Sequence, residues 1–526
     1  MKKYFKYIML GMVVMASSSC KDYLDINTNP NSLTSATPAL VLPQAITGAA
    51  SITNTFSQTF SDFAGYQANA GGFGGFGAVV TYDFGTGTGA GLWTATYDNA
   101  NDFQYIIDNT ADDASLTFST SIARIMKSFA FERLVNQYND VPYSDALKAT
   151  ASLTPKYDKA EDVYKACIAE LDNAIAAIAA GQANAATQTI VATSDPLFGG
   201  NMDLWKKFAN TVKLRMLIKM AGVPAQAAYA TTAFAGMNTT LGFLTTDAIN
   251  QPGYVKTERP SPIYSSLGFS GTGTNVNTSR IPTKWIFSFY NGTKLSDPAR
   301  ASIIYRSYPS TPINQLGDES TGVPAALSAG SAWFTGNNAA TSLPGVVKGP
   351  TQGQPVMLAA ESYFLQAEAY ARGYLTGNAE TAFNAGITES FTYLYKDATG
   401  AIAAGKNVAA DVATYKTENA TSPLVNFTLA TTLPLKIEAI ITQKYIALNM
   451  INNDEAFNEF RRTGFPKVQN GSLDPLLTFA SRQSVSTHVD KLPTRILYPQ
   501  VEYDLNPANA PAGINKFSSL IFWDLN

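Results

Sequence analysis

Apolar residues recur at helical spacing through most of this 526-residue chain, and this pattern constrains the fold more than any other feature. Residues three and four apart share one face of a helix, so such a stripe predicts an amphipathic helix with that face buried. The stripes cover residues 122–134, 158–180, 205–218, 357–370, 383–394 and 437–448. The sequence therefore predicts a mainly α protein.

Local signals mark the ends of several predicted helices. Asp158 precedes Glu161 by three residues in a capping-box pattern, and Gly181 follows that stripe. Pro434 suits the first turn of the last helix. The stripes at 357–370 and 383–394 flank a predicted turn at 373–378, and alanines at 367 and 371 allow close packing. This pair is similar to a tetratricopeptide unit.

Two long regions lack helical periodicity. Residues 71–91 contain nine glycines interleaved with aromatic residues, and residues 250–350 are rich in Ser, Thr, Gly, Pro and Asn around further aromatics. Loops of this length are usually functional or disordered, and aromatic content argues against disorder. We therefore expect loop-rich regions with minor β structure at about 71–102 and 250–350, on the side that binds a ligand.

Composition argues against several classes of function. Charged residues make up 15% of the chain, the net charge is −3, and the only histidine is His488. No basic block is present, so a nucleic-acid partner is not expected. A single histidine excludes His-rich metal sites and leaves a histidine-dependent triad only if His488 serves it. We predict a protein without catalytic residues, metal or cofactor.

The N-terminus has the pattern of an export signal. Lysines at 2, 3 and 6 precede an apolar run at 8–16, which is too short to span a membrane, and small residues lead to Cys20. We predict a lipoprotein signal peptide at 1–19, a lipidated tether at 20–45 anchored through Cys20, and a single domain at 46–526. A soluble export signal with an incidental cysteine is the alternative. Cys167 lies on a helical stripe, so we expect a buried, inert thiol.

Aromatic residues in the first loop region are the best candidates for ligand contacts. Aromatic faces stack on the apolar face of a sugar, while Asn, Gln, Asp and Arg pair with its hydroxyls. The candidates here are Phe73, Phe76, Tyr82, Phe84, Trp93 and Tyr97, with Asn99, Asn101 and Asp102 nearby. The alternative is that these aromatics only pin the loop to the helices.

The second loop region and the C-terminal part offer weaker candidates. Trp333 and Phe334 follow small residues, and we expect them near the surface as possible ligand contacts, whereas Trp285 is expected in the core. Arginines 461 and 462 follow Glu455 and Glu459 on a helical run. They could grip a carboxylated ligand, but a structural ion-pair network is the favoured interpretation.

Short motifs in a fixed order resemble the SusD/RagB family of outer-membrane lipoproteins. The mature chain opens with DYLDINTNP at 22–30, and further matches are YNDVPYSDA at 138–146, TPKYD at 154–158, WKKFAN at 205–210, AEAY at 367–370, EAFNEFRRTGFP at 455–466 and RILYPQVEYDLN at 495–506. The resemblance covers nearly the whole mature chain. It implies a SusD-like fold with tetratricopeptide-like helix pairs and a surface-exposed lipoprotein.

The resemblance also implies a partner and a ligand class. Proteins of this family associate with a SusC-like TonB-dependent transporter and capture oligosaccharides or, in the RagB branch, peptides. Two other classes stay open. A glycoside hydrolase would need a carboxylate pair, for which Asp83, Asp98 and Asp102 are candidates without an evident pair. A helical-repeat scaffold could bind only proteins.

Overall fold

The computed structural model describes residues 37–526 and is mainly helical, as predicted, with sixteen α-helices and four short strands in that range. The predicted signal peptide, Cys20 and most of the predicted tether lie outside the described residues. Helix α2 already begins at Pro38, and Leu42 and Ala45 on it are buried. The last residues of the predicted tether therefore belong to the folded core, because an apolar stripe there packs against other helices.

The elements follow one another with short strands between the helices. The first part contains α2 (Pro38–Phe60), β1 (Gln67–Asn69), α3 (Ala78–Thr81), α4 (Ala90–Thr110), α5 (Thr117–Tyr138), α6 (Ala160–Gln182), α7 (Met202–Ala221) and α8 (Ala227–Ala235). The middle contains β2 (Ala248–Asn250), α9 (Pro262–Leu267), β3 (Arg280–Pro282), α10 (Lys284–Phe287) and α11 (Pro298–Ile304). The last part contains β4 (Gln354–Met357), α12 (Ala359–Ala371), α13 (Ala379–Tyr395), α14 (Val408–Glu418), α15 (Leu433–Leu448), α16 (Asn453–Thr463) and α17 (Gln500–Leu505).

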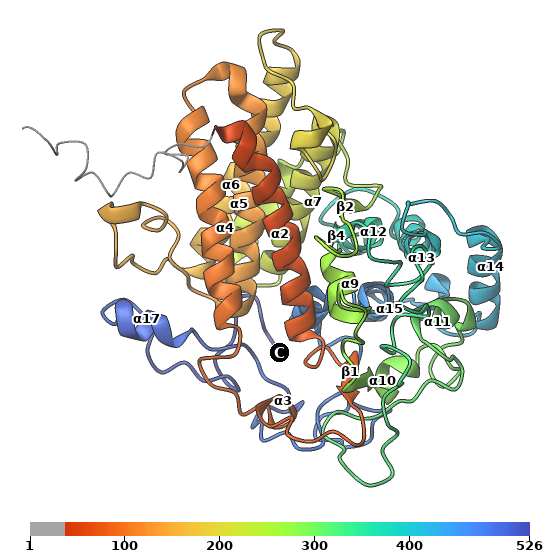
Figure 1. The fold of residues 1–526 in the computed structure, drawn as a ribbon. Helices are drawn as coiled ribbons and strands as arrows, with labels where there is room; N and C mark the ends of the chain where they lie inside the picture. The colour runs from red at the N-terminus through yellow and green to blue at the C-terminus, as the bar shows by residue number, and fades with distance from the viewer. Residues whose placement is uncertain (1–36) are drawn as a thin grey trace, which may run out of the picture.

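Helices α2, α4, α5, α6 and α7 form a bundle, and α12, α13 and α15 form a second group of packed helices (Figure 1). Helix α5 lies inside the bundle and is buried on nearly all sides, because α2, α4, α6 and α7 all contact it. In the second group, Phe364 of α12 faces Phe383 and Gly386 of α13 across the predicted turn. The predicted helix pair is confirmed.

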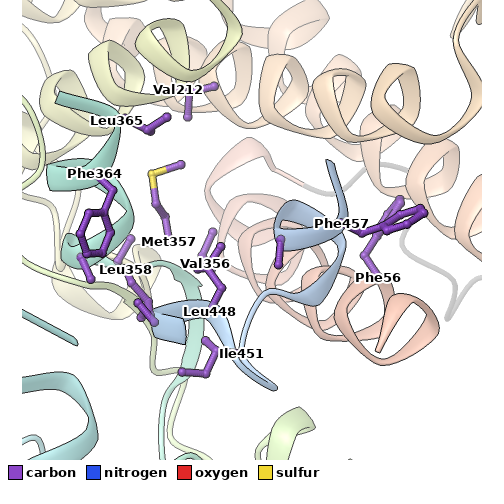
Figure 2. Close-up of a cluster of buried hydrophobic side chains, with 14 of the residues drawn as sticks. Phe56, Val212, Val356, Met357, Leu358, Phe364, Leu365, Leu448, Ile451 and Phe457 are labelled. Atoms are coloured by element: carbon purple, nitrogen blue, oxygen red, sulfur yellow. The ribbon is translucent and has the colours of Figure 1, made fainter. Parts of the chain in front are cut away.

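The hydrophobic core is continuous between these two groups. Figure 2 shows buried side chains from α2, α7, β4, α12, α15 and α16 meeting in one cluster, with Val212, Leu365 and Leu448 among them. Trp285 and Cys167 are buried as predicted, and burial raises the pKa of the Cys167 thiol to about 12. A thiol with that pKa is un-ionised near neutrality, as expected for an inert core residue.

Charged side chains form a network inside the helical part. Arg215 pairs with Glu132 and lies 2.8 Å from Glu361, and Lys219 lies 2.8 Å from Glu455. Burial opposes ionisation of Glu132, but Arg215 and Lys219 hold its pKa below the ordinary value. The paired charges therefore stay ionised although water is excluded.

The predicted network at 455–462 is part of this arrangement. Arg462 pairs with Glu459 and lies 2.7 Å from Glu368 of α12. Arg461 differs from the prediction, because its guanidinium donates to the carbonyls of Thr494 and Asn136 instead of to a carboxylate. Both arginines thus fix α16 to neighbouring segments.

Several predicted boundaries are wrong. Helix α6 begins at Ala160, and the Asp158 carboxylate accepts hydrogen bonds from the backbone of Tyr143 and Ser144, so it caps a loop and not the helix. Gly181 lies inside α6, and Met357 belongs to β4. Helix α4 covers residues 90–102 of the predicted loop region. Tertiary packing thus decides the boundaries where local signals are weak.

Candidate ligand-binding hollow

An open hollow of about 690 Å³ lies where the glycine-rich loop meets the C-terminal end of α2 and the small sheet β1–β3. These segments come together in the lower part of Figure 1 around α3 and β1. Antiparallel pairing of β1 with β3 sets Asn69 opposite Arg280. The hollow is lined by Gln58, Asp62, Gln67, Phe73, Gly74, Gly75, Phe76, Val79, Ser266, Asn277, Ser279 and Arg280.

Phe73 presents an aromatic ring to solvent at this hollow. Its exposed fraction is 44%, and it is the only Phe, Tyr or Trp among residues 37–526 that is largely exposed. The loop that holds it is fixed at Gly71, where an added Cβ would lie 2.2 Å from the carbonyl oxygen of Val323. Gly75, between Phe73 and Phe76, has a φ of +79°, a left-handed backbone conformation that favours glycine. The loop therefore holds the apolar ring of Phe73 in a solvent-exposed position.

Arg280 lines the hollow and is fixed by contacts with two of its other lining residues. Its guanidinium lies 4.5 Å from the centre of the Phe76 ring and its Nε lies 3.1 Å from an Asp62 oxygen. Burial raises the pKa of Asp62, although Arg280 acts in the opposite direction. The guanidinium and carboxylate neutralise each other, so this pair offers no uncompensated charge to an ionic ligand in the hollow.

Amide side chains supply the neutral hydrogen-bonding groups. Gln67 donates to the Ser61 hydroxyl and lies 3.5 Å from the amide nitrogen of Asn277. The Gln58 amide nitrogen is buried and has no hydrogen-bond partner among the described residues. Amide groups beside an exposed ring suit a neutral, hydroxylated ligand, because the ring covers the apolar face and the amides pair with hydroxyls.

Several residues that were predicted to contact a ligand are buried in the structure. Tyr82 is fully buried and its hydroxyl accepts the backbone N–H of Ser481, and Phe84 is buried as well. Trp333 and Phe334 are fully buried, contrary to the prediction that they lie near the surface. The Phe334 ring packs at 5.7 Å from that of Tyr264. These rings fix loops to the core, which is the alternative that the sequence left open.

Trp93 has a similar structural role on α4. Its exposed fraction is 4%, its ring lies 4.9 Å from that of Tyr138 and 5.8 Å from that of Tyr498, and its Nε1 donates to Glu502 at 3.1 Å. Tyr157 donates to the second oxygen of the same carboxylate at 2.7 Å. Three of the ordered sequence motifs therefore meet around Trp93.

The remaining candidates lie away from the hollow. Tyr97 is half-buried and donates to the carbonyl of Pro142 at 2.7 Å, while Asn101 is exposed on α4. The carboxyl candidates Asp83, Asp98 and Asp102 do not line the hollow. Of the predicted ligand contacts, only Phe73 and Phe76 line it.

The polar residues of the hollow were missed in the sequence. Asp62, Gln67 and Arg280 are not part of any motif, and Arg280 is separated from the others by more than 200 residues. Only the pairing of β1 with β3 and the end of α2 bring them together. No sequence signal near Arg280 distinguishes it from other loop arginines.

Comparison with known proteins identifies the family. A model of the SusD-like family, described as starch-binding and associating with the outer membrane, matches residues 30–499. The chain belongs to the SusD-like family. No curated protein matches it.

Solved structures of SusD homologues share the fold. A SusD homologue from Bacteroides fragilis is 22% identical, with 93% of this chain and 99% of that chain covered and a TM-score of 0.67. A chitin-binding SusD homologue from Flavobacterium johnsoniae is 21% identical, with 92% and 99% covered and a TM-score of 0.66. At these identities the likeness shows a SusD-like fold, which confirms the predicted fold class.

Within residues 37–526 of this SusD-like protein, none of the helices combines the length and apolar character needed to span a membrane. In the same range, no group of three or more His, Cys, Asp or Glu side chains is arranged to hold a metal ion.

Proposed function

We propose that this SusD-like protein is a cell-surface nutrient-binding lipoprotein that captures a neutral oligosaccharide in the Phe73 hollow. The observation that supports this most is Phe73, the one largely exposed aromatic ring of the described chain, beside amides and a neutralised Arg280. The family description as starch-binding and associating with the outer membrane agrees with it. Binding without catalysis requires only these groups, and we propose that the protein is not an enzyme.

The ligand can be tested with the mature chain, residues 20–526, on a glycan array and a peptide library, followed by calorimetry. We expect binding to a neutral oligosaccharide, weakened about threefold to tenfold in Phe73→Ala because one aromatic contact is lost. Leu153→Ala is the matched control, since Leu153 is also an exposed apolar side chain but does not line the hollow. Binding to peptides alone would favour a RagB-like peptide-uptake protein. Equal binding by both variants would contradict the proposed site.

The proposed anchor is a lipid on Cys20, and the proposed partner is a SusC-like TonB-dependent outer-membrane transporter. We expect Cys20→Ala to move the protein from the outer-membrane fraction to the soluble fraction. Affinity purification from detergent-solubilised membranes is expected to recover the transporter with the wild-type chain. A Cys20→Ala protein that stays in the membrane would contradict lipid anchoring.

A further inference from the structure

A second, smaller cavity of about 250 Å³ lies at the C-terminal end of α16, where residues 488–494 and 524–526 meet it. We call it the His488 cavity. His488, Asp490 and Asp524 contribute its polar lining, and Phe460, Val468 and Pro493 contribute its apolar lining. None of these residues lines the Phe73 hollow.

Asp524 places a largely buried carboxylate at the wall of this cavity. Its exposed fraction is 5%, and its Oδ1 accepts the backbone N–H of Asn526 at 3.2 Å. No described residue donates to its Oδ2 or forms an ion pair with it. Burial raises the pKa of Asp524 to about 6. Because its Oδ2 is not closed off from solvent and lines the cavity, a ligand there can donate a hydrogen bond to it in place of water.

The other charged groups at this cavity are already engaged. The Asp490 carboxylate lies 2.7 Å from Nδ1 of His488 and accepts the backbone N–H of Leu492 at 2.8 Å. The Arg461 guanidinium donates from its two terminal nitrogens to the carbonyls of Thr494 and Asn136. Two carboxylates therefore face one guanidinium and one imidazole. The near balance of charge favours a neutral ligand over an ionic one, since an ion would leave a net charge in a partly dry cavity.

The apolar and polar linings together match the chemistry of a sugar ring. Phe460, Val468 and Pro493 can cover the C–H groups of a ring, while the Asp524 carboxylate can accept hydrogen bonds from its hydroxyls. The volume lies below the range of about 300–1,000 Å³ that is typical of larger ligands. We propose that the His488 cavity binds one neutral monosaccharide or polyol, independently of the Phe73 hollow.

The single histidine makes this proposal directly testable by NMR. Because the chain has no other histidine, the imidazole protons of His488 give signals that need no assignment by mutation. The mature chain is titrated separately with glucose, galactose, mannose, N-acetylglucosamine and, as the charged counterpart, glucuronate. We expect at least one neutral sugar to shift the His488 signals saturably, with nuclear Overhauser effects between sugar and imidazole protons.

Two variants distinguish binding in the His488 cavity from binding in the Phe73 hollow. Phe73→Ala is expected to leave the His488 shifts unchanged. Asp524→Asn keeps the shape but removes the charge of the acceptor, and we expect it to weaken binding at least about tenfold. Thermal melting of Asp524→Asn reports whether it folds. If it does not, the nuclear Overhauser effects in the wild-type protein decide.

Any one of four results would overturn the proposal. The first is that none of the neutral sugars shifts the His488 signals, and the second is that glucuronate alone shifts them. The third is that a folded Asp524→Asn protein binds the sugar as tightly as the wild type. Loss of the shifts in Phe73→Ala would likewise overturn it, because the response would then come from the hollow.

Discussion

Arg215 and Arg280 are both paired with carboxylates beside aromatic rings, yet they lie in opposite settings. Arg215 joins Glu132 and Glu361 inside the helical part, where all three side chains have exposed fractions of 2% or less. Arg280 and Asp62 retain exposed fractions of 13% and 11% and line an open hollow. The first group of three side chains joins helices α5, α7 and α12, whereas the Arg280–Asp62 pair lines a hollow that is open to water. The same chemistry therefore serves folding in one region and, in the function we propose, binding in the other.

Arg215→Met tests the buried side of this comparison and has the largest expected effect. Removing one partner leaves buried carboxylates uncompensated, so we expect the free energy of unfolding to fall by about 3–5 kcal/mol. Urea unfolding monitored by circular dichroism measures it. Arg124→Met is the control, because Arg124 and Glu170 form a half-exposed pair and we expect a loss below about 1 kcal/mol. Equal losses would show that burial does not distinguish the pairs.

Trp333→Ala tests whether a loop aromatic belongs to the core or to the ligand surface. Trp333 is fully buried, so we expect a loss of about 3–5 kcal/mol in unfolding free energy. Phe73→Ala is the counterpart at an exposed ring, and its unfolding free energy is expected to stay within about 0.5 kcal/mol of the wild type. A stable Trp333→Ala protein with impaired ligand binding would restore Trp333 as a ligand contact.

Acid titration isolates the Glu368–Arg462 pair between α12 and α16. Burial works against ionisation of Glu368, but Arg462 and Arg372 lower its pKa from 4.5 to about 2. Because the pKa of Glu368 is lower in the folded state, its ion pairs stabilise the fold fully above pH 4.5, and this stabilisation is lost as the pH falls towards 2. The stabilisation amounts to about 3 kcal/mol.

The comparison of wild type with Glu368→Gln measures this effect. We expect the stability advantage of the wild type to be largest above about pH 5 and to shrink steadily towards pH 2. Glu319→Gln, at an exposed glutamate, controls for the loss of one negative charge. An advantage of the wild type that does not change across this pH range would contradict the ion-pair explanation.

Much of the helical part could be predicted from local pattern. The stripes at 122–134, 205–218 and 383–394 became α5, α7 and α13, because periodic apolar residues need a buried face whatever they pack against. The ion pairs of α16 were also foreseeable from the spacing of Glu459 and Arg462. Helices α2 and α4 were missed, since α2 contains Pro43 and runs of small residues, and α4 follows a glycine-rich loop.

The candidate site was predictable only in part. The sequence pointed to the aromatic loop, and Phe73 and Phe76 do line the hollow. It could not separate them from Tyr82 and Trp93, because exposure depends on what packs above each ring. Trp93 is covered by tyrosines from motifs that begin at residues 138, 154 and 495.

The sequence by itself determined a mainly α, SusD-like protein with aromatic loops, because periodicity and ordered motifs are local properties of the chain. Only the tertiary structure decided which aromatic ring meets solvent and which charges stay paired. The Phe73 ring is exposed and Asp62 pairs with Arg280 because of contacts between segments more than 200 residues apart. Burial and long-range pairing are set by packing, and no single stretch of sequence contains them.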